Sequence, residues 1–235
     1  MPSCHSTNDI AMQLIKKADI QEGVIVLTDD QTQGRGQRGN QWVSEKGSNL
    51  IMSIILKPKF LRAQDQFALN ILASLSVKEA ISHFIPEASV KVKWPNDVLI
   101  NDKKLTGILI ENSIQGNLIS HSVIGIGVNV NQEKMNFEKA TSMLLQTGDK
   151  FEIDNFLEIL VIRMEQNYLQ LKNGAFHQLK SKYLQHLFGF KVEKIYRSEY
   201  LFKGQIEDVD DSGRLIIRTS STLKSFDFKE VEFIY

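Results

Sequence analysis

The sequence contains very little cysteine and no excess of either charge. The single cysteine, Cys4, excludes a disulfide bond within the chain. Lysine plus arginine and aspartate plus glutamate both count 28, so the formal net charge is zero. No overall electrostatic field therefore attracts nucleic acid or an anionic membrane surface, and we expect neither as a partner.

Long hydrophobic runs are absent as well. The uninterrupted apolar stretches last only a few residues, whereas roughly 20 apolar residues are needed to cross a bilayer. The N-terminus also lacks the charged segment and the apolar segment of a secretory signal. We therefore expect a cytoplasmic protein that does not associate with membranes.

The hydrophobic pattern changes near Leu187 and predicts two domains. Up to residue 186, helical spacing alternates with strand-like runs, and from Leu187 onward only short β-like segments remain. The predicted helices cover residues 10–15, 67–81, 154–171 and 176–186, with Ser6 or Thr7, Asp65 and Asp154 as helix caps for the first three. The predicted strands cover residues 24–28, 49–56, 91–94, 98–100, 105–111 and 118–130, followed by 191–197, 200–209, 215–219, 224–228 and 231–235. We predict a large domain of residues 1–186 and a small β domain of residues 187–235.

Residues 34–39 read Gly-Arg-Gly-Gln-Arg-Gly. The G-x-G-x-x-G pattern marks a dinucleotide site only where a helix begins directly after it. Here residues 40–48 have no helical period, and residues 49–56 read as a strand. The glycines therefore belong to a loop that can approach a ligand closely, and Arg35 and Arg38 provide permanent charge for a carboxylate or a phosphate.

Further motifs follow this loop in a fixed order along the chain. They are Ser6-Thr7-Asn8, Gln31, the glycine-arginine loop, Trp42, Trp94-Pro95-Asn96-Asp97, Lys104, Gly107 and the Gly-Ile-Gly-Val-Asn run that ends at Asn129. Together they resemble the biotin protein ligases over most of the sequence. This resemblance implies that ATP and biotin are substrates, that Mg²⁺ is needed, and that biotin passes through biotinyl-AMP to a lysine of a biotin carboxyl carrier protein domain.

The resemblance also implies a fold. We expect an α+β protein with a mixed β-sheet and helices packed on one side, as in class II synthetases, followed by a small SH3-like β-barrel. Residues 1–186 would form the catalytic domain that binds biotin and ATP, and residues 187–235 would form the barrel. Larger relatives carry an N-terminal winged helix and repress transcription. Because Ser6 lies so near the start of this chain, we expect a ligase without a repressor role, and a homodimer is compatible with the family.

Adenylation explains why fixed cations are needed. A carboxylate is a poor acylating agent until it is activated, and the enzyme must bring it to the α-phosphate although both are anions. The resemblance places Lys104 between the two anions, Arg35 and Arg38 at the carboxylate and the phosphates, and Asp97 where it orients Mg²⁺ or the incoming amine. From the residues alone, the alternative for Lys104 is a solvated strand lysine beside Lys103, which we regard as the weaker one, and Asp97 could equally be a turn residue.

The ureido ring of biotin needs hydrogen-bond donors and acceptors in an apolar pocket. Residues 6–8 could provide them, although the same residues also suit a plain helix cap. The predicted biotin-binding set is Ser6, Thr7, Asn8, Gln31, Gly34, Arg35, Gly36, Gln37, Lys104 and Gly107. The predicted set for ATP and the adenylate is Arg38, Trp42, Asn96, Lys104 and Asn129.

Two local features complete the sequence-based picture. Gln37 occupies a position that is often arginine in the family, so this chain has one cation fewer near the activated carboxylate. Cys4 and His5 have no further cysteine or suitably spaced histidine nearby, so we regard both as incidental to the chemistry. The sequence identifies no metal ligands.

Two other functions fit parts of the pattern. A lipoate ligase would use the same adenylation chemistry, but its usual Arg-Arg-Gly-Gly-Gly signature is absent here, whereas Trp-Pro-Asn-Asp is present. A non-catalytic sensor of biotin or nucleotide would be favoured if Lys104 or Arg35 were missing, and both are present.

We predict that residues 31–48 are mobile without ligand and become ordered with biotinyl-AMP, because loop closure would shield a reactive mixed anhydride from water. Amide hydrogen exchange of this segment should therefore slow markedly when biotinyl-AMP is added. Equal protection with and without the adenylate would contradict the prediction.

Overall fold

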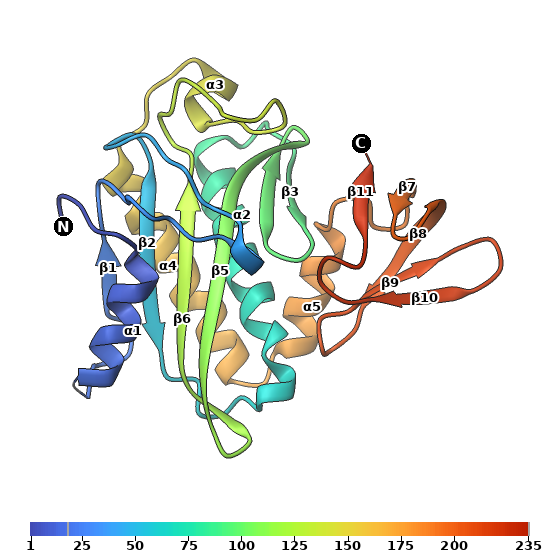
Figure 1. The fold of residues 1–235 in the computed structure, drawn as a ribbon, viewed down its shortest axis with the longest axis horizontal. Coiled ribbons are helices and arrows are strands. Elements are labelled where there is room, and N and C mark those ends of the chain that lie inside the picture. Colours follow the sequence, from blue (N-terminus) through green and yellow to red (C-terminus); the bar gives the residue numbers. More distant parts are fainter. Residues whose placement is uncertain (18, 235) are drawn as a thin grey trace.

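The computed structural model describes residues 1–17 and 19–234, with Arg38 described by its backbone alone. Two antiparallel sheets form the framework (Figure 1). The six-stranded sheet has the order β1-β2-β6-β5-β4-β3. Its strands are β1 (Ile25–Leu27), β2 (Leu50–Leu56), β3 (Val90–Lys93), β4 (Asp97–Ile100), β5 (Lys103–Gln115) and β6 (Leu118–Val128).

The second sheet has five strands in the order β10-β9-β8-β7-β11. Its strands are β7 (Glu193–Arg197), β8 (Leu201–Val209), β9 (Leu215–Arg218), β10 (Leu223–Phe226) and β11 (Glu232–Ile234). All five lie inside the segments predicted from the sequence except that β10 begins one residue earlier, and the sheet is consistent with the expected small SH3-like module. The exact division into residues 1–186 and 187–235 stays a prediction.

Helices cover the two faces of the six-stranded sheet unequally. The helices are α1 (Thr7–Lys17), α2 (Phe67–Phe84), α3 (Met143–Thr147), α4 (Ile153–Lys172) and α5 (Phe176–Gln185). Most of α2 is buried, because it lies between the sheet and α4. The α+β class is therefore confirmed, and α2, α4 and α5 gather behind the sheet (Figure 1).

The opposite face of the sheet carries α1, which the expectation of helices on one side did not include. Ala11 packs there against Val26, Ile55 and Val123 in a small separate core. The pairing between the named strands is antiparallel throughout, and among the described residues parallel pairing occurs only as isolated bridges such as Cys4 with Gln31. The expected mixed sheet is thus an antiparallel one, in which short turns connect β3, β4, β5 and β6 in succession.

Two of the predicted helix caps are wrong. Asp65 ends a short 3₁₀ helix (Ala63–Asp65) and pairs with Arg62 at 2.7 Å, while Gln66 occupies the cap position of α2. Asp154 lies inside the first turn of α4, whose cap position is Glu152. The predicted cap lies one residue from the actual cap position in α2 and two residues from it in α4. The first helix does begin at Thr7, directly after Ser6.

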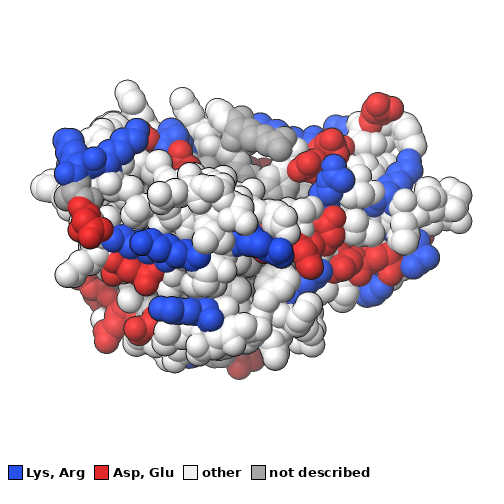
Figure 2. Space-filling model, turned by 90° about the horizontal axis from the view of Figure 1, so that it is seen from below, with Lys and Arg blue, Asp and Glu red and all other residues white. Residues whose placement is uncertain are grey.

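The surface agrees with the zero net charge of the sequence. On the face that Figure 2 shows, basic and acidic side chains are interspersed without a large region of one sign. Within the described chain, every helix is too short or too polar to span a bilayer.

Trp94 joins the two sheets. Its indole Nε1 donates a buried hydrogen bond of 2.8 Å to the carbonyl oxygen of Gly213, which lies in the turn between β8 and β9. Its ring meets Phe228 edge-on at 5.3 Å. Gly213 has φ +95° and lies so close to Phe67 that an added Cβ would come within 2.5 Å of that ring. The C-terminal sheet is therefore docked tightly at the segment that carries Asn96 and Asp97.

We expect Trp94→Phe to lower the free energy of unfolding by about 1–3 kcal/mol, because it leaves the buried Gly213 carbonyl without a donor. Urea denaturation measures the change. Tyr200→Phe is the matched control, because Tyr200 is 54% exposed and its loss should stay within about 0.5 kcal/mol. Equal effects of the two substitutions would contradict the importance of this hydrogen bond.

Candidate active site

A cavity of about 430 Å³ opens on the face of the six-stranded sheet that also carries α1. The glycine-arginine loop crosses in front of β6 and β5 to form one wall (Figure 1). The predicted site residues that line the cavity are Ser6, Thr7, Asn8, Gln31, Arg35, Gly36, Gln37, Trp42, Asn96, Asp97, Lys104 and Gly107. Residues that are far apart in the sequence thus meet around one space.

An irregularity in strand pairing places Lys104 in this cavity. Val98 of β4 pairs with Thr106 of β5, but the next residue, Leu99, pairs with Lys104. The register therefore skips Leu105, which forms a β-bulge. Because side chains alternate along a strand, Lys104 and Gly107 would otherwise point to opposite faces. The bulge brings both to the cavity.

Lys104 and Asp97 form an ion pair at the cavity wall. The distance from Lys104 Nζ to Asp97 Oδ1 is 2.7 Å, and the carboxylate is the more buried partner. Asp97 lies directly opposite Gly107 in the register of β4 and β5. A fixed cation beside a carboxylate can bind an anionic group while the carboxylate orients a cationic or metal-bound one.

The floor of the cavity is a tryptophan that lies on two glycines. A Cβ atom at Gly107 would come within 2.8 Å of the Trp42 ring, and one at Gly127 within 2.5 Å. Lys104 Nζ lies 6.0 Å from the centre of the same ring. Trp42 Nε1 has no hydrogen-bond partner among the described atoms. The glycines therefore allow a flat aromatic surface to lie next to the lysine.

A polar end of the cavity is built around Gln31. Its side-chain Oε1 accepts a hydrogen bond of 2.9 Å from the backbone N–H of Thr7. Residues 30–33 pair through the backbone with Cys4 and His5, for example from the Thr32 N–H to the Cys4 carbonyl at 2.9 Å. Cys4, regarded as chemically incidental, thus forms the isolated parallel bridge with Gln31 that helps hold it in place.

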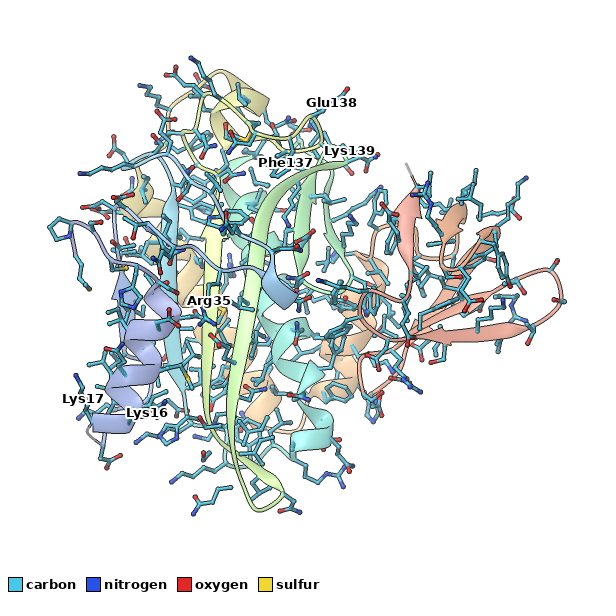
Figure 3. All side chains as sticks on the ribbon, in the orientation of Figure 1. Lys16, Lys17, Arg35, Phe137, Glu138 and Lys139 are labelled. Carbon is cyan, nitrogen blue, oxygen red and sulfur yellow. The ribbon has the colours of Figure 1, made fainter. Side chains whose placement is uncertain are left out.

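Arg35 has partners that the sequence did not indicate. One of its terminal nitrogens lies 2.7 Å from Asp9 Oδ1 and 2.7 Å from Glu111 Oε2. Figure 3 shows Arg35 between α1 and β5. The predicted anion-binding arginine is therefore already engaged with two carboxylates.

Two of the predicted residues that the structure describes, Gly34 and Asn129, do not line the cavity. Gly34 is buried behind it, where an added Cβ would come within 2.2 Å of the Trp42 carbonyl oxygen. Asn129 is also buried and donates its amide to the Thr141 carbonyl at 3.0 Å, and its contact with adenine stays a prediction. The side chain of Arg38 lies outside the described part of the chain.

The C-terminal sheet contributes a wall that sequence reasoning missed. Lys229, Val231, Glu232 and Phe233 line the cavity, and Lys93 Nζ lies 5.5 Å from the centre of the Phe233 ring. Residues 231–233 read as part of an ordinary short strand and Lys229 lies between two predicted strands, so no local signal indicated a role in the site. Only the docking of the two sheets brings them to the site.

The comparisons with known proteins agree with this architecture. The sequence profile of the Biotin/lipoate A/B protein ligase family matches residues 1–129. The chain belongs to this family.

Individual relatives extend the match over nearly the whole chain. The biotin--[acetyl-CoA-carboxylase] ligase of Paracoccus denitrificans is 30% identical over 221 residues, covering 91% of this chain and 90% of the relative. The bifunctional ligase/repressor BirA of Bacillus subtilis is 30% identical over 217 residues, covering 90% of this chain. The chain spans 66% of the length of that Bacillus relative.

A solved structure shows the same fold. The biotin protein ligase from Aquifex aeolicus in complex with biotin and ATP superposes with a TM-score of 0.82 at 28% identity. The similarity covers 99% of this chain and 96% of the Aquifex chain. Both sheets are therefore part of the shared architecture.

Proposed function

We propose that this protein is a ligase that activates biotin with ATP to biotinyl-AMP and then transfers biotin to a lysine of a carrier protein. The observation that carries the proposal is the Lys104–Asp97 pair at 2.7 Å, which lies beside the Trp42 floor in one cavity with Thr7 and Gln31. The relatives named for biotin ligation, and the neighbour solved with biotin and ATP, support these substrates.

In the first step, a carboxylate oxygen of biotin attacks the α-phosphorus of ATP, and the bond to pyrophosphate breaks. Both reacting groups are anionic, so a fixed cation between them lowers their repulsion and stabilises the charge that develops on the phosphoryl oxygens. Lys104 supplies this cation. Its pairing with Asp97 orients the ammonium group toward the cavity before the substrates arrive.

In the second step, the amine of the carrier lysine attacks the acyl carbon of the mixed anhydride, and the bond to AMP breaks. The attacking amine loses one proton as the amide forms. Asp97 is placed to orient this amine, because its carboxylate lines the cavity next to Lys104. The carrier is a biotin carboxyl carrier protein domain, in agreement with the name of the Paracoccus relative.

The same proposal includes Mg²⁺ as an ion that the adenylation step needs. Within residues 1–17 and 19–234, no three His, Cys, Asp or Glu side chains come together in a way that could hold a metal ion. Mg²⁺ is commonly held by one or two carboxylates together with substrate phosphates, and Asp97 fits as such a carboxylate. When bound, the ion would neutralise charge on the phosphate oxygens.

Other parts of the sequence-based picture stay predictions. They include the contacts of Arg38 with phosphate, of Asn129 with adenine and of Gln37 with the activated carboxylate. A homodimer and a cytoplasmic location are predictions in the same sense.

The alternatives are separated by one assay. Pyrophosphate release from ATP is measured with biotin or lipoate as the only acid, and label transfer to a biotin carboxyl carrier domain is then followed. Release and transfer that depend on biotin are expected. Dependence on lipoate would select the other branch of the family, and binding of biotin without release would select a sensor.

We predict that Lys104→Ala lowers the rate constant of biotinyl-AMP formation roughly 100- to 1000-fold, as expected for removal of one preorganised charge-stabilising group. The free energy of unfolding should change by no more than about 0.5 kcal/mol, because Lys104 is partly exposed. Pyrophosphate release and urea denaturation measure the two quantities.

Lys103→Ala is the matched control for this prediction. Lys103 is the preceding residue of β5 and is exposed, so its removal should leave adenylation unchanged. Loss of folding in Lys104→Ala, or similar adenylation rates in the two variants, would overturn the role assigned to Lys104.

A further inference from the structure

Glu111 lies outside every motif that the sequence analysis singled out. It lies on β5, two positions beyond Leu109 and four beyond Gly107, and the alternation of a strand places all three on the cavity side. One of its carboxylate oxygens, Oε2, accepts a hydrogen bond of 2.8 Å from Asn8 Nδ2 and one of 2.7 Å from Arg35. A single acceptor thus connects β5 with α1 and with the glycine-arginine loop.

The contact with Glu111 fixes the orientation of the Asn8 amide. An amide nitrogen has two hydrogens to donate, and those of Asn8 go to Glu111 and, at 3.3 Å, to the carbonyl of Leu109. Asn8 Oδ1 accepts a hydrogen bond of 2.6 Å from Ser53 Oγ. A carboxylate only accepts, so the amide nitrogen must face Glu111. Asn8 is 3% exposed, and both of its donors are used within the protein.

The second contact ties the loop to the sheet. Arg35 bridges Asp9 on α1 and Glu111 on β5. The Gly34 carbonyl accepts a hydrogen bond from the Trp42 N–H at 3.0 Å, so the position of Arg35 is coupled to the tryptophan floor. An exposed ion pair alone contributes little to the free energy of unfolding. Here, however, one guanidinium group connects α1, β5 and the glycine-arginine loop.

We propose that Glu111 is a positioning residue of the acid-binding site. It fixes Asn8 next to Ser6 and Thr7 and, through Arg35, it holds the glycine-arginine loop over the cavity. Arg35 then acts on the loop rather than on the substrate carboxylate. The assignment of biotin as the acid rests on the proposed function, whereas the fixing of the loop does not.

Steady-state kinetics of pyrophosphate release test the proposal with Glu111→Gln, which keeps the size of the side chain and removes its charge. We expect the KM for biotin to rise about tenfold, with kcat and the KM for ATP changing less than twofold. Asp65→Asn is the matched control, because it also removes a carboxylate from an arginine pair at 2.7 Å, away from the cavity. It should leave all three constants unchanged.

Amide hydrogen exchange without any ligand tests the loop separately. Residues 31–42 should exchange faster in Glu111→Gln than in the wild type. They should also exchange faster in Asp9→Asn, which removes the charge of the other partner of Arg35 and leaves the Asn8 contacts intact. Asp9→Asn should raise the KM for biotin less than Glu111→Gln does.

These outcomes separate the two proposals. Wild-type exchange in both variants, or a Glu111→Gln effect on kcat and on both KM values alike, would overturn the positioning role. A wild-type protein that shows no biotin-dependent pyrophosphate release would overturn the proposed function, and faster loop exchange in both variants would still support the role of Glu111 in fixing the loop.

Discussion

The geometry of the cavity depends on one β-bulge in the pairing of β4 with β5. The bulge at Leu105 changes the side of the sheet on which the following residues of β5 appear. Without it, Lys104 would point to the same side as the apolar residues that pack on α2, and a buried ammonium group there would be strongly unfavourable. With it, Lys104 reaches Asp97 while Leu105 and Ile108 stay in the core.

The other walls are built around this strand. Gly107 and Gly127 lie on neighbouring strands at paired positions, so the two missing side chains leave one continuous flat area for the Trp42 ring. Glu111, farther along the same strand, ties α1 and the loop to the sheet. A single strand thus provides the cation, one of the two glycines beneath Trp42 and the carboxylate that binds Arg35 of the glycine-arginine loop.

Much of this arrangement could be predicted from the sequence, because it is encoded locally. Hydrophobic periodicity located the long helices and nearly all the strands, and glycine and proline marked the loops. The resemblance to biotin protein ligases identified twelve residues that do line the cavity. The prediction failed where a contact joins residues that are far apart in the sequence. Arg35 and Glu111 are 76 positions apart, and Trp94 and Gly213 are 119 positions apart, so neither pair leaves a local pattern. The bulge at Leu105 is likewise invisible in an alternation of apolar residues.

The hydrogen bond between Trp94 and the turn of the C-terminal sheet connects the shared motifs to a part of the chain that lies outside them. The shared profile ends at residue 129, yet Lys229 and Phe233 complete the outer wall of the cavity. Because the acceptor of the Trp94 hydrogen bond is a main-chain carbonyl, the small sheet can change most of its side chains and remain docked. The outer wall therefore comes from a part of the chain that carries none of the shared motifs, and its side chains can change without removing the acceptor of this hydrogen bond.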